Sequence, residues 1–213
     1  MKSLHVASAS LAAGAALLAG SASAETKSFD LPAFDEIDAS AGVDVNVSVG
    51  GAQSVIAENE NGDFDDLVLE VRRGELRASR KNKRFGFGKR ERYKIVVTMP
   101  ALEGIEISSG ADADVTGVNA DHFSIDGSSG ADADIAGTCK TLDIDVSSGA
   151  NINASDLICE VATVDVSSGG NAKIHATQRL NADASSGGHA TVYGKPEYVD
   201  IDKSSGGGVS VRN

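Results

Sequence analysis

The tripeptide Ser-Ser-Gly occurs six times in the second half of this 213-residue chain, and its spacing constrains the fold more than any other feature. Successive copies are 18 to 20 residues apart and lie at 108–110, 128–130, 147–149, 167–169, 185–187 and 204–206. A period of this length is typical of solenoids, in which each repeat forms one coil and buries its inner face only against neighbouring coils. We therefore expect one coil for each copy.

Apolar and polar residues alternate on both sides of each triplet, as in strands with one buried face. Parallel stacking would place each strand on the same strand of the next coil, about 4.8 Å away, and glycine suits the corner because it tolerates a positive φ. The sequence thus predicts an all-β fold, a right-handed parallel β-helix or solenoid with coils of 18–20 residues. The buried position five residues before each glycine holds Ile105, Ile125, Ile144, Val164, Ala182 and Ile201.

A seventh, imperfect copy begins at Ile37, and a different kind of sequence separates it from the main series. This insert reads as β-hairpins followed by a strand that ends at Pro100. The expected strands are 43–49 paired with 55–57, 67–71 paired with 76–79, and 93–99. We expect an N-terminal β-hairpin region and a solenoid within one domain, at residues 25–100 (with a basic loop at 79–94) and 101–213.

Residues 1–24 have the features of a secretory signal peptide. An apolar run follows Lys2, and an Ala-x-Ala pattern ends at Ala24, which predicts cleavage before Glu25. The alternative is a membrane anchor, but the run is shorter than the roughly 20 apolar residues that a span requires. We expect an exported protein, periplasmic or at the cell surface or secreted, without a transmembrane span.

The two cysteines are spaced for a disulfide between neighbouring coils. Cys139 and Cys159 are one coil apart in sequence, so stacking would bring their Cα atoms within the range that a disulfide needs. An exported protein folds in an oxidising compartment, where such bonds persist. The alternative is a pair of buried free thiols.

Acidic residues recur at outward positions of the predicted coils, in a chain of net charge −12. The position four residues before each glycine is acidic in every copy and includes Asp126, Asp145 and Asp165. Further columns contain Asp112, Asp114, Asp132 and Asp134. Oxygen ligands of this kind suit Ca²⁺, but the same residues also fit a solvated acidic face that keeps the rod soluble and discourages edge pairing. Both interpretations stay open, and no other cofactor is indicated.

The segment 79–94 is strongly basic and contains two phenylalanines between glycines. Cations next to aromatic rings can bind polyanions through charge and stacking. The alternatives are self-association, with this loop contacting the acidic rod of a second molecule, and a mobile hairpin tip without a ligand. The candidate binding residues are Arg84, Phe85, Phe87, Lys89 and Arg90.

The order of these segments resembles that of the head GIN domain family, which is associated with autotransporter adhesins. The resemblance rests on "FDEIDASAGVDVNVSVG", "LVLEVRRGELRAS", the basic loop and "YKIVVTMPALEGIEISSGADADVTG", and it covers nearly all of the chain after the signal peptide. It implies a right-handed β-helix-like fold in an exported bacterial protein with no established biochemical activity. It supplies no catalytic residues.

We therefore expect a non-enzymatic, adhesin-like interaction scaffold whose partners are envelope glycans, other polyanions or proteins. Catalysis is not expected, because the histidines after the signal peptide lie in different coils and lack the spacing of a nucleophile or metal site. Specific nucleic-acid recognition is not expected either. The alternative function is a Ca²⁺-dependent module that binds or cleaves polysaccharide.

Overall fold

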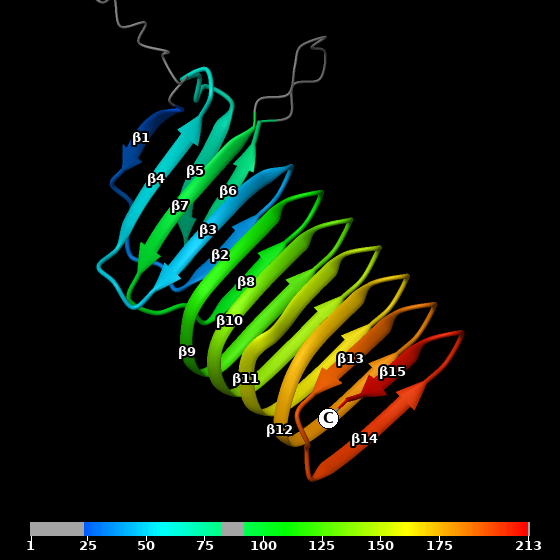
Figure 1. Ribbon diagram of the computed structural model, residues 1–213. Helices are drawn as coiled ribbons and strands as arrows, with labels where there is room; N and C mark the ends of the chain where they lie inside the picture. The colour runs from blue at the N-terminus through cyan, green and yellow to red at the C-terminus, as the bar shows by residue number, and fades with distance from the viewer. Residues whose placement is uncertain (1–23, 82–91, 213) are drawn as a thin grey trace, which may run out of the picture.

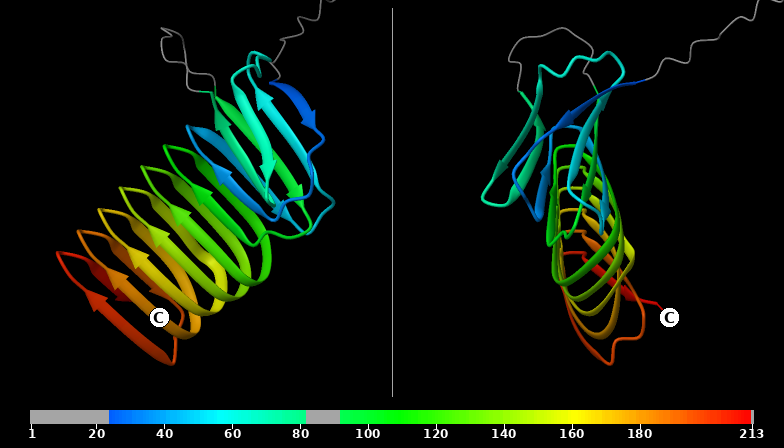
Figure 2. Two further views of the ribbon diagram at one scale, coloured as in Figure 1. Left: turned by 180° about the vertical axis from the view of Figure 1, so that it is seen from behind. Right: turned by 90° about the vertical axis from the view of Figure 1, so that its left-hand side faces the viewer.

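The computed structural model describes residues 24–81 and 92–212, and these residues form a β-solenoid (Figure 1). Fifteen strands join in one continuous sheet that wraps around a narrow core, and the described residues contain no helix. Figure 2 shows the coils edge-on as two facing layers. The predicted signal peptide, apart from Ala24, lies outside the described residues. So do the loop residues Arg84, Phe85, Phe87, Lys89 and Arg90.

The main coils stack in parallel, as the Ser-Ser-Gly period predicted. Each long strand begins after a triplet, bends midway and ends before the next triplet, so it forms both layers of its coil. The all-β parallel solenoid predicted from the sequence is therefore confirmed. In chain order, the strands are β8 (Gly104–Ile107), β9 (Asp112–Gly127), β10 (Asp132–Val146), β11 (Asn151–Val166), β12 (Asn171–Ala184), β13 (His189–Tyr193), β14 (Tyr198–Lys203) and β15 (Gly208–Val211).

Each triplet forms the tight corner between two layers. At the third copy, the N–H of Ala150 donates to the carbonyl of Ser147 at 3.0 Å, which closes a four-residue turn. Both central residues have positive φ, 50° for Ser148 and 76° for Gly149, as in a type I′ turn. The sequence indicated this conformation for glycine only, and serine adopts it as well at every copy.

The imperfect copy upstream belongs to the same stack. β2 (Glu36–Ala39) pairs in parallel with β8, and β3 (Val43–Val49) pairs in parallel with β9. Ile37 lies opposite Ile105, so the register predicted for the seventh copy is correct.

The insert differs in part from the predicted hairpins. β5 (Leu67–Arg72) and β6 (Glu75–Arg80) form the second hairpin as expected. The predicted pairing of 43–49 with 55–57 in a first hairpin was wrong, because β7 (Tyr93–Met99) lies between β3 and β4 (Ser54–Asn59). The N–H groups of Gly50 and Gly51 donate to the carbonyl of Met99 at 2.8 and 3.2 Å. The turn after β3 is therefore anchored to β7 instead of folding β4 back onto β3.

β6 and β7 complete one further coil at the N-terminal end of the stack. β6 pairs in parallel with β2 and β7 with β3, so these two strands supply the two layers of that coil. The antiparallel strands β4 and β5 then cover the outer edges of this coil, and β1 (Glu25–Phe29) pairs with β4. This end of the stack is therefore covered by antiparallel strands, while β14 and β15 form the opposite end (Figure 1).

The core consists of columns of buried side chains that run along the solenoid, with one side chain from each coil. Where one column has a small residue, a larger side chain from a neighbouring column fills the space. Gly127 occupies a position that holds larger apolar residues in adjacent coils, and a Cβ built there would lie 2.8 Å from Cδ1 of Ile152. Each fully buried Ile, Leu or Val contributes about 1.5–3 kcal/mol to stability. The predicted disulfide is confirmed: Cys139 on β10 and Cys159 on β11 are bonded across adjacent coils, with Cα atoms 4.5 Å apart.

Candidate interaction surface

Outward side chains form straight files along the solenoid, because the strands of successive coils are in register. One file carries a carboxyl group in every coil from β2 to β14. We call it the carboxylate file, and its members are Asp38, Glu106, Asp126, Asp145, Asp165, Asp183 and Asp202. The structure thus contains the acidic ladder that the repeat predicted.

Several carboxyl groups of this file have a pKa above the ordinary value, mainly because the protein partly buries them. Like charges one coil away add to the effect: after burial, Asp183 and Asp145 raise the pKa of Asp165. At Asp38, burial raises the pKa and Arg77, whose Nε lies 3.7 Å from the carboxylate, lowers it. In the folded protein, burial and neighbouring carboxylates therefore disfavour the charged form of these groups. The affected groups are Asp38, Glu106, Asp145 and Asp165.

The other layer carries two adjacent files in which carboxylates give way to amides. Asn151 Nδ2 donates to Asp132 Oδ1 at 2.9 Å, and Asn171 Nδ2 donates to Asn151 Oδ1 at 3.0 Å. These ladders hold the side chains in fixed orientations at the coil repeat. In the second file, Asn153 Nδ2 donates to Asp134 Oδ1 at 2.7 Å. We call the two files the carboxylate–amide files. The first consists of Asp112, Asp132, Asn151 and Asn171, and the second of Asp114, Asp134 and Asn153.

The seven aspartates considered for calcium are distributed over these files and do not surround a common point. Asp126, Asp145 and Asp165 lie in the carboxylate file, and the other four in the carboxylate–amide files. Within residues 24–81 and 92–212, no group of three or more His, Cys, Asp or Glu side chains could hold a metal ion. A shallow hollow of about 100 Å³ lies against Asp114 and Asp134. Calcium binding at these residues stays a prediction.

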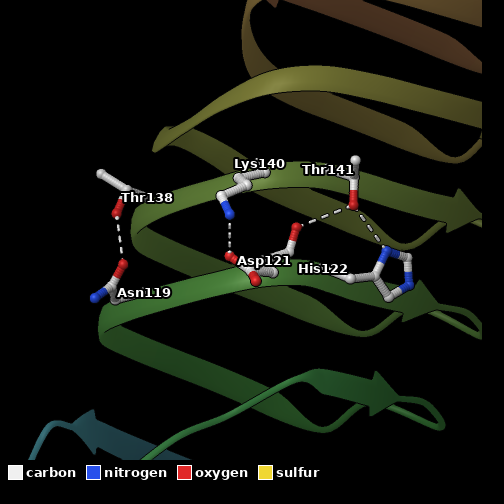
Figure 3. Close-up of polar contacts among 6 residues, drawn as sticks. All are labelled: Asn119, Asp121, His122, Thr138, Lys140 and Thr141. Carbon is white, nitrogen blue, oxygen red and sulfur yellow. Dashed lines mark hydrogen bonds and ion pairs between the residues drawn. The ribbon is translucent and has the colours of Figure 1, made fainter.

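A third set of polar contacts lies at the bend between the two layers (Figure 3). Lys140 Nζ lies 2.8 Å from Asp121 Oδ1, and this hydrogen bond is the main reason that the pKa of Lys140 is raised. Thr141 Oγ1 donates to the carbonyl of Asp121 at 3.1 Å and lies 3.0 Å from Nδ1 of His122. A hydroxyl has one hydrogen, so Thr141 accepts from His122. Sequence reasoning missed these pairs, although the coil period aligns their residues.

The remaining histidines are separated from one another. His189 Nδ1 lies 2.8 Å from the carbonyl of Gly187 in a corner. His175 lies on β12, in a hollow with Tyr193 and Asp156 that the sequence did not identify. The signal for that hollow was available: the interval between the triplets on either side of β12, at 18 residues, is the shortest.

Several solved structures share the fold of this chain at low sequence identity. A crystal structure described as a "putative adhesin" from Bacteroides fragilis superposes with a TM-score of 0.71 at 18% identity and covers 90% of this chain and 98% of its own. One so described from Parabacteroides merdae has a TM-score of 0.56 at 14% identity, with 91% and 98% covered. Another, from Parabacteroides distasonis, has a TM-score of 0.52 at 17% identity, with the same coverage. These likenesses show the fold.

Two further results bear on identity. No curated protein matches the chain. Among the residues that the structure describes, no helix is long and apolar enough to cross a membrane. Residues 33–196 match the family model described as "Putative auto-transporter adhesin, head GIN domain". That match spans most of the chain, including the first copy of the repeat, the insert and the main coils, and the chain therefore belongs to the head GIN domain family.

Proposed function

We propose that this protein is an exported, non-catalytic adhesion scaffold that binds glycan chains of the cell envelope along its carboxylate–amide files. The observation that carries this proposal is the ladder from Asp132 through Asn151 to Asn171, which repeats fixed hydrogen-bonding groups from coil to coil. The family's association with adhesins supports a binding role, and the signal-peptide features of residues 1–24 support export to the periplasm or cell surface.

The geometry of the files fits an extended polysaccharide. Coils repeat at about 4.8 Å along the solenoid, close to the length of one pyranose unit, so a glycan lying along a file would place one sugar on each coil. Each amide can both donate and accept, and each carboxylate accepts from sugar hydroxyls. Many weak contacts of this kind act together, because binding of one unit raises the effective concentration of the next. Because the same amide and carboxylate groups recur in successive coils, the surface favours multivalent binding over catalysis at a single centre.

The test is an array of bacterial envelope polysaccharides, probed with the wild type and with the variant Asn151→Ala/Asn153→Ala. Both amides are surface groups of the ladder, so the variant should keep its fold. A matched control is Asn119→Ala/Gln178→Ala, which removes two exposed amides at the bend. We expect the file variant to lose about tenfold or more in affinity and the control to bind as the wild type does. Equal binding by both variants, or no glycan bound at all, would contradict the proposal.

The same array separates the alternative functions. Binding that requires millimolar calcium would favour a calcium-dependent polysaccharide module, and release of reducing ends would favour a cleaving one. Retention on a heparin column that disappears when Arg84, Lys89 and Arg90 are replaced by Ser would assign polyanion binding to the basic loop. A change of mass in the same variant would indicate self-association through that loop.

A further inference from the structure

A change in coil length produces a hollow on the solenoid near its C-terminal end. In the pairing of β11 with β12, Ala154 lies opposite Ile174, but the next aligned pair is Ile158 with His175. β11 therefore has three extra residues, 155–157, where β12 has none. These residues bulge at the bend of the coil, and the shorter coil beside them leaves a depression. The 18-residue interval between the triplets at 167–169 and 185–187 is the sequence counterpart of this step.

The depression has a volume of about 440 Å³, and six residues from three coils line it. A volume of this size lies in the range of small-molecule sites. The lining residues are Ser155, Asp156, His175, Tyr193, Gly194 and Lys195.

His175 and Tyr193 form one wall of the hollow, and Ile158 continues the same outward file beside it. Ile158 lies opposite His175, and His175 lies opposite Tyr193 on β13. Ile158 has 46% of its surface exposed, although it is a large apolar residue. Gly194 has a φ of +92°, and a Cβ there would lie 2.9 Å from Cδ2 of His175 and 2.3 Å from the carbonyl oxygen of Ala176. Only glycine lets the chain turn this close to the imidazole.

Polar groups of both kinds surround this wall. Asp156 offers an exposed carboxylate and Lys195 an exposed ammonium group, and neither has a side-chain hydrogen bond or ion pair to the residues that the structure describes. Ser155 Oγ donates to Asn153 Oδ1 at 2.8 Å, so its lone pairs remain free to accept. Asn153 is the last member of a carboxylate–amide file. The register partner of Asn153 on β12 is Lys173, so the hollow lies beside the end of this file, on the side of Asn153 where Ser155 contacts it.

We propose that the hollow is a binding site for one pyranose unit of a glycan. The apolar C–H face of the sugar packs on Tyr193 and His175, and its hydroxyl groups donate to Asp156 and Ser155 and accept from Lys195. An aromatic wall with a few polar groups of opposite kinds is the usual composition of a small-ligand site. The proposal rests on the proposed glycan-binding function and adds to it the place where a single sugar is held. A glycan chain that runs along the file ends or branches there.

The test is an NMR titration of the protein with the methyl glycosides of glucose, galactose, mannose and N-acetylglucosamine. We expect at least one glycoside to shift the resonances of His175 and Tyr193. The variants Tyr193→Ala and Asp156→Asn should each weaken that binding about tenfold. Tyr198→Ala and Asp143→Asn are matched controls, because they remove an exposed tyrosine and an exposed aspartate outside the hollow, and they should bind as the wild type does.

The outcomes separate this inference from the proposed function. If polysaccharides bind but no glycoside shifts these resonances, the hollow is not a sugar site and the files alone account for binding. If Tyr193→Ala abolishes polysaccharide binding while Asn151→Ala/Asn153→Ala does not, the hollow is the site and the files are not. Equal weakening by the variants and their controls overturns the inference. So does a titration in which inorganic phosphate, and no glycoside, shifts the two resonances. Asp156→Asn changes shape very little, so it separates lost recognition from lost folding.

Discussion

Asp145 on β10 and Asp165 on β11 lie directly opposite one another on adjacent coils, and the pKa of both carboxyl groups is raised. Partial burial is the main cause for each, and the charge of Asp145 contributes at Asp165. Ionisation of this pair therefore opposes folding.

This relationship predicts that the protein is more stable in mildly acidic solution than at neutral pH. The folded state holds protons at pH values where the unfolded chain, with ordinary values of 3.8 for aspartate and 4.5 for glutamate, has released them. The free energy of unfolding should increase as the pH falls from neutrality through the raised pKa values, and level off below the ordinary ones. Urea unfolding at a series of pH values from 7.5 down to 4 measures the difference.

A double variant identifies the carboxylate file as the source of that effect. Asp145→Asn/Asp165→Asn should raise the urea midpoint at pH 7.5 and flatten its dependence on pH. Glu197→Gln, a charge removal outside the file, is the control and should keep the dependence of the wild type. A double variant that retains the full pH dependence would assign the effect to other groups.

The disulfide should make a large contribution to stability. Removing the bond between Cys139 and Cys159, which closes a loop with a sequence separation of 20, frees the unfolded chain and costs about 3 kcal/mol. The variant Cys139→Ala/Cys159→Ala, compared by urea unfolding with the wild type in which the disulfide is intact, measures the loss. A difference below about 1 kcal/mol would show that stacking alone fixes these two coils.

The corners require their left-handed backbone. Gly149 has positive φ and a Cβ built on it would meet nothing within 4 Å, so Gly149→Ala isolates the cost of the conformation itself. We expect a loss of about 1–2 kcal/mol in the free energy of unfolding. Ser148→Gly is the converse change at the neighbouring positive φ and should cause no loss. A neutral Gly149→Ala would mean that the corner relaxes to another turn.

Lys203 should protect the C-terminal edge of the stack from pairing with another chain. It lies opposite the buried Ala184, at a position that faces the core in the other coils, and its ammonium group donates to the carbonyl of Val209 at 3.4 Å. Inward-facing charges on edge strands oppose edge-to-edge association. Lys203→Val should increase the average mass in light scattering as concentration rises, whereas Lys173→Val, on the outer face, should not. Unchanged mass in both variants would contradict this role.

Much of the solenoid could be predicted from the sequence because its repeat is local and strict. The triplet spacing aligns Ile105 with Ile125 and Cys139 with Cys159, and the structure has both alignments. The insert was harder, because alternation predicts a strand without identifying its partner. Gly50-Gly51 reads as a hairpin turn, yet β3 pairs with β7, which lies far along the chain.

The candidate site was less predictable for a related reason. The repeat places carboxylates in files, but whether they converge on an ion depends on the distances between side chains. The hollow at His175 and Tyr193 arises because neighbouring coils differ in length by one or two residues. The sequence shows this difference in length, but it does not show where in the coil the bend lies, and therefore where the extra residues bulge. The left-handed serines of the corners were missed because serine rarely adopts positive φ.

The most direct test of the stacked files is a distance between their ends. Spin labels on Glu106→Cys and Asp202→Cys are separated by five coil steps of the carboxylate file, which corresponds to about 24 Å at the spacing of parallel strands. Pulsed electron–electron double resonance should give a narrow distribution of distances between the two labels near this value, widened only by the label side chains. A broad distribution, or a mean about twice as long, would contradict the stacking on which the surface files and the sugar site depend.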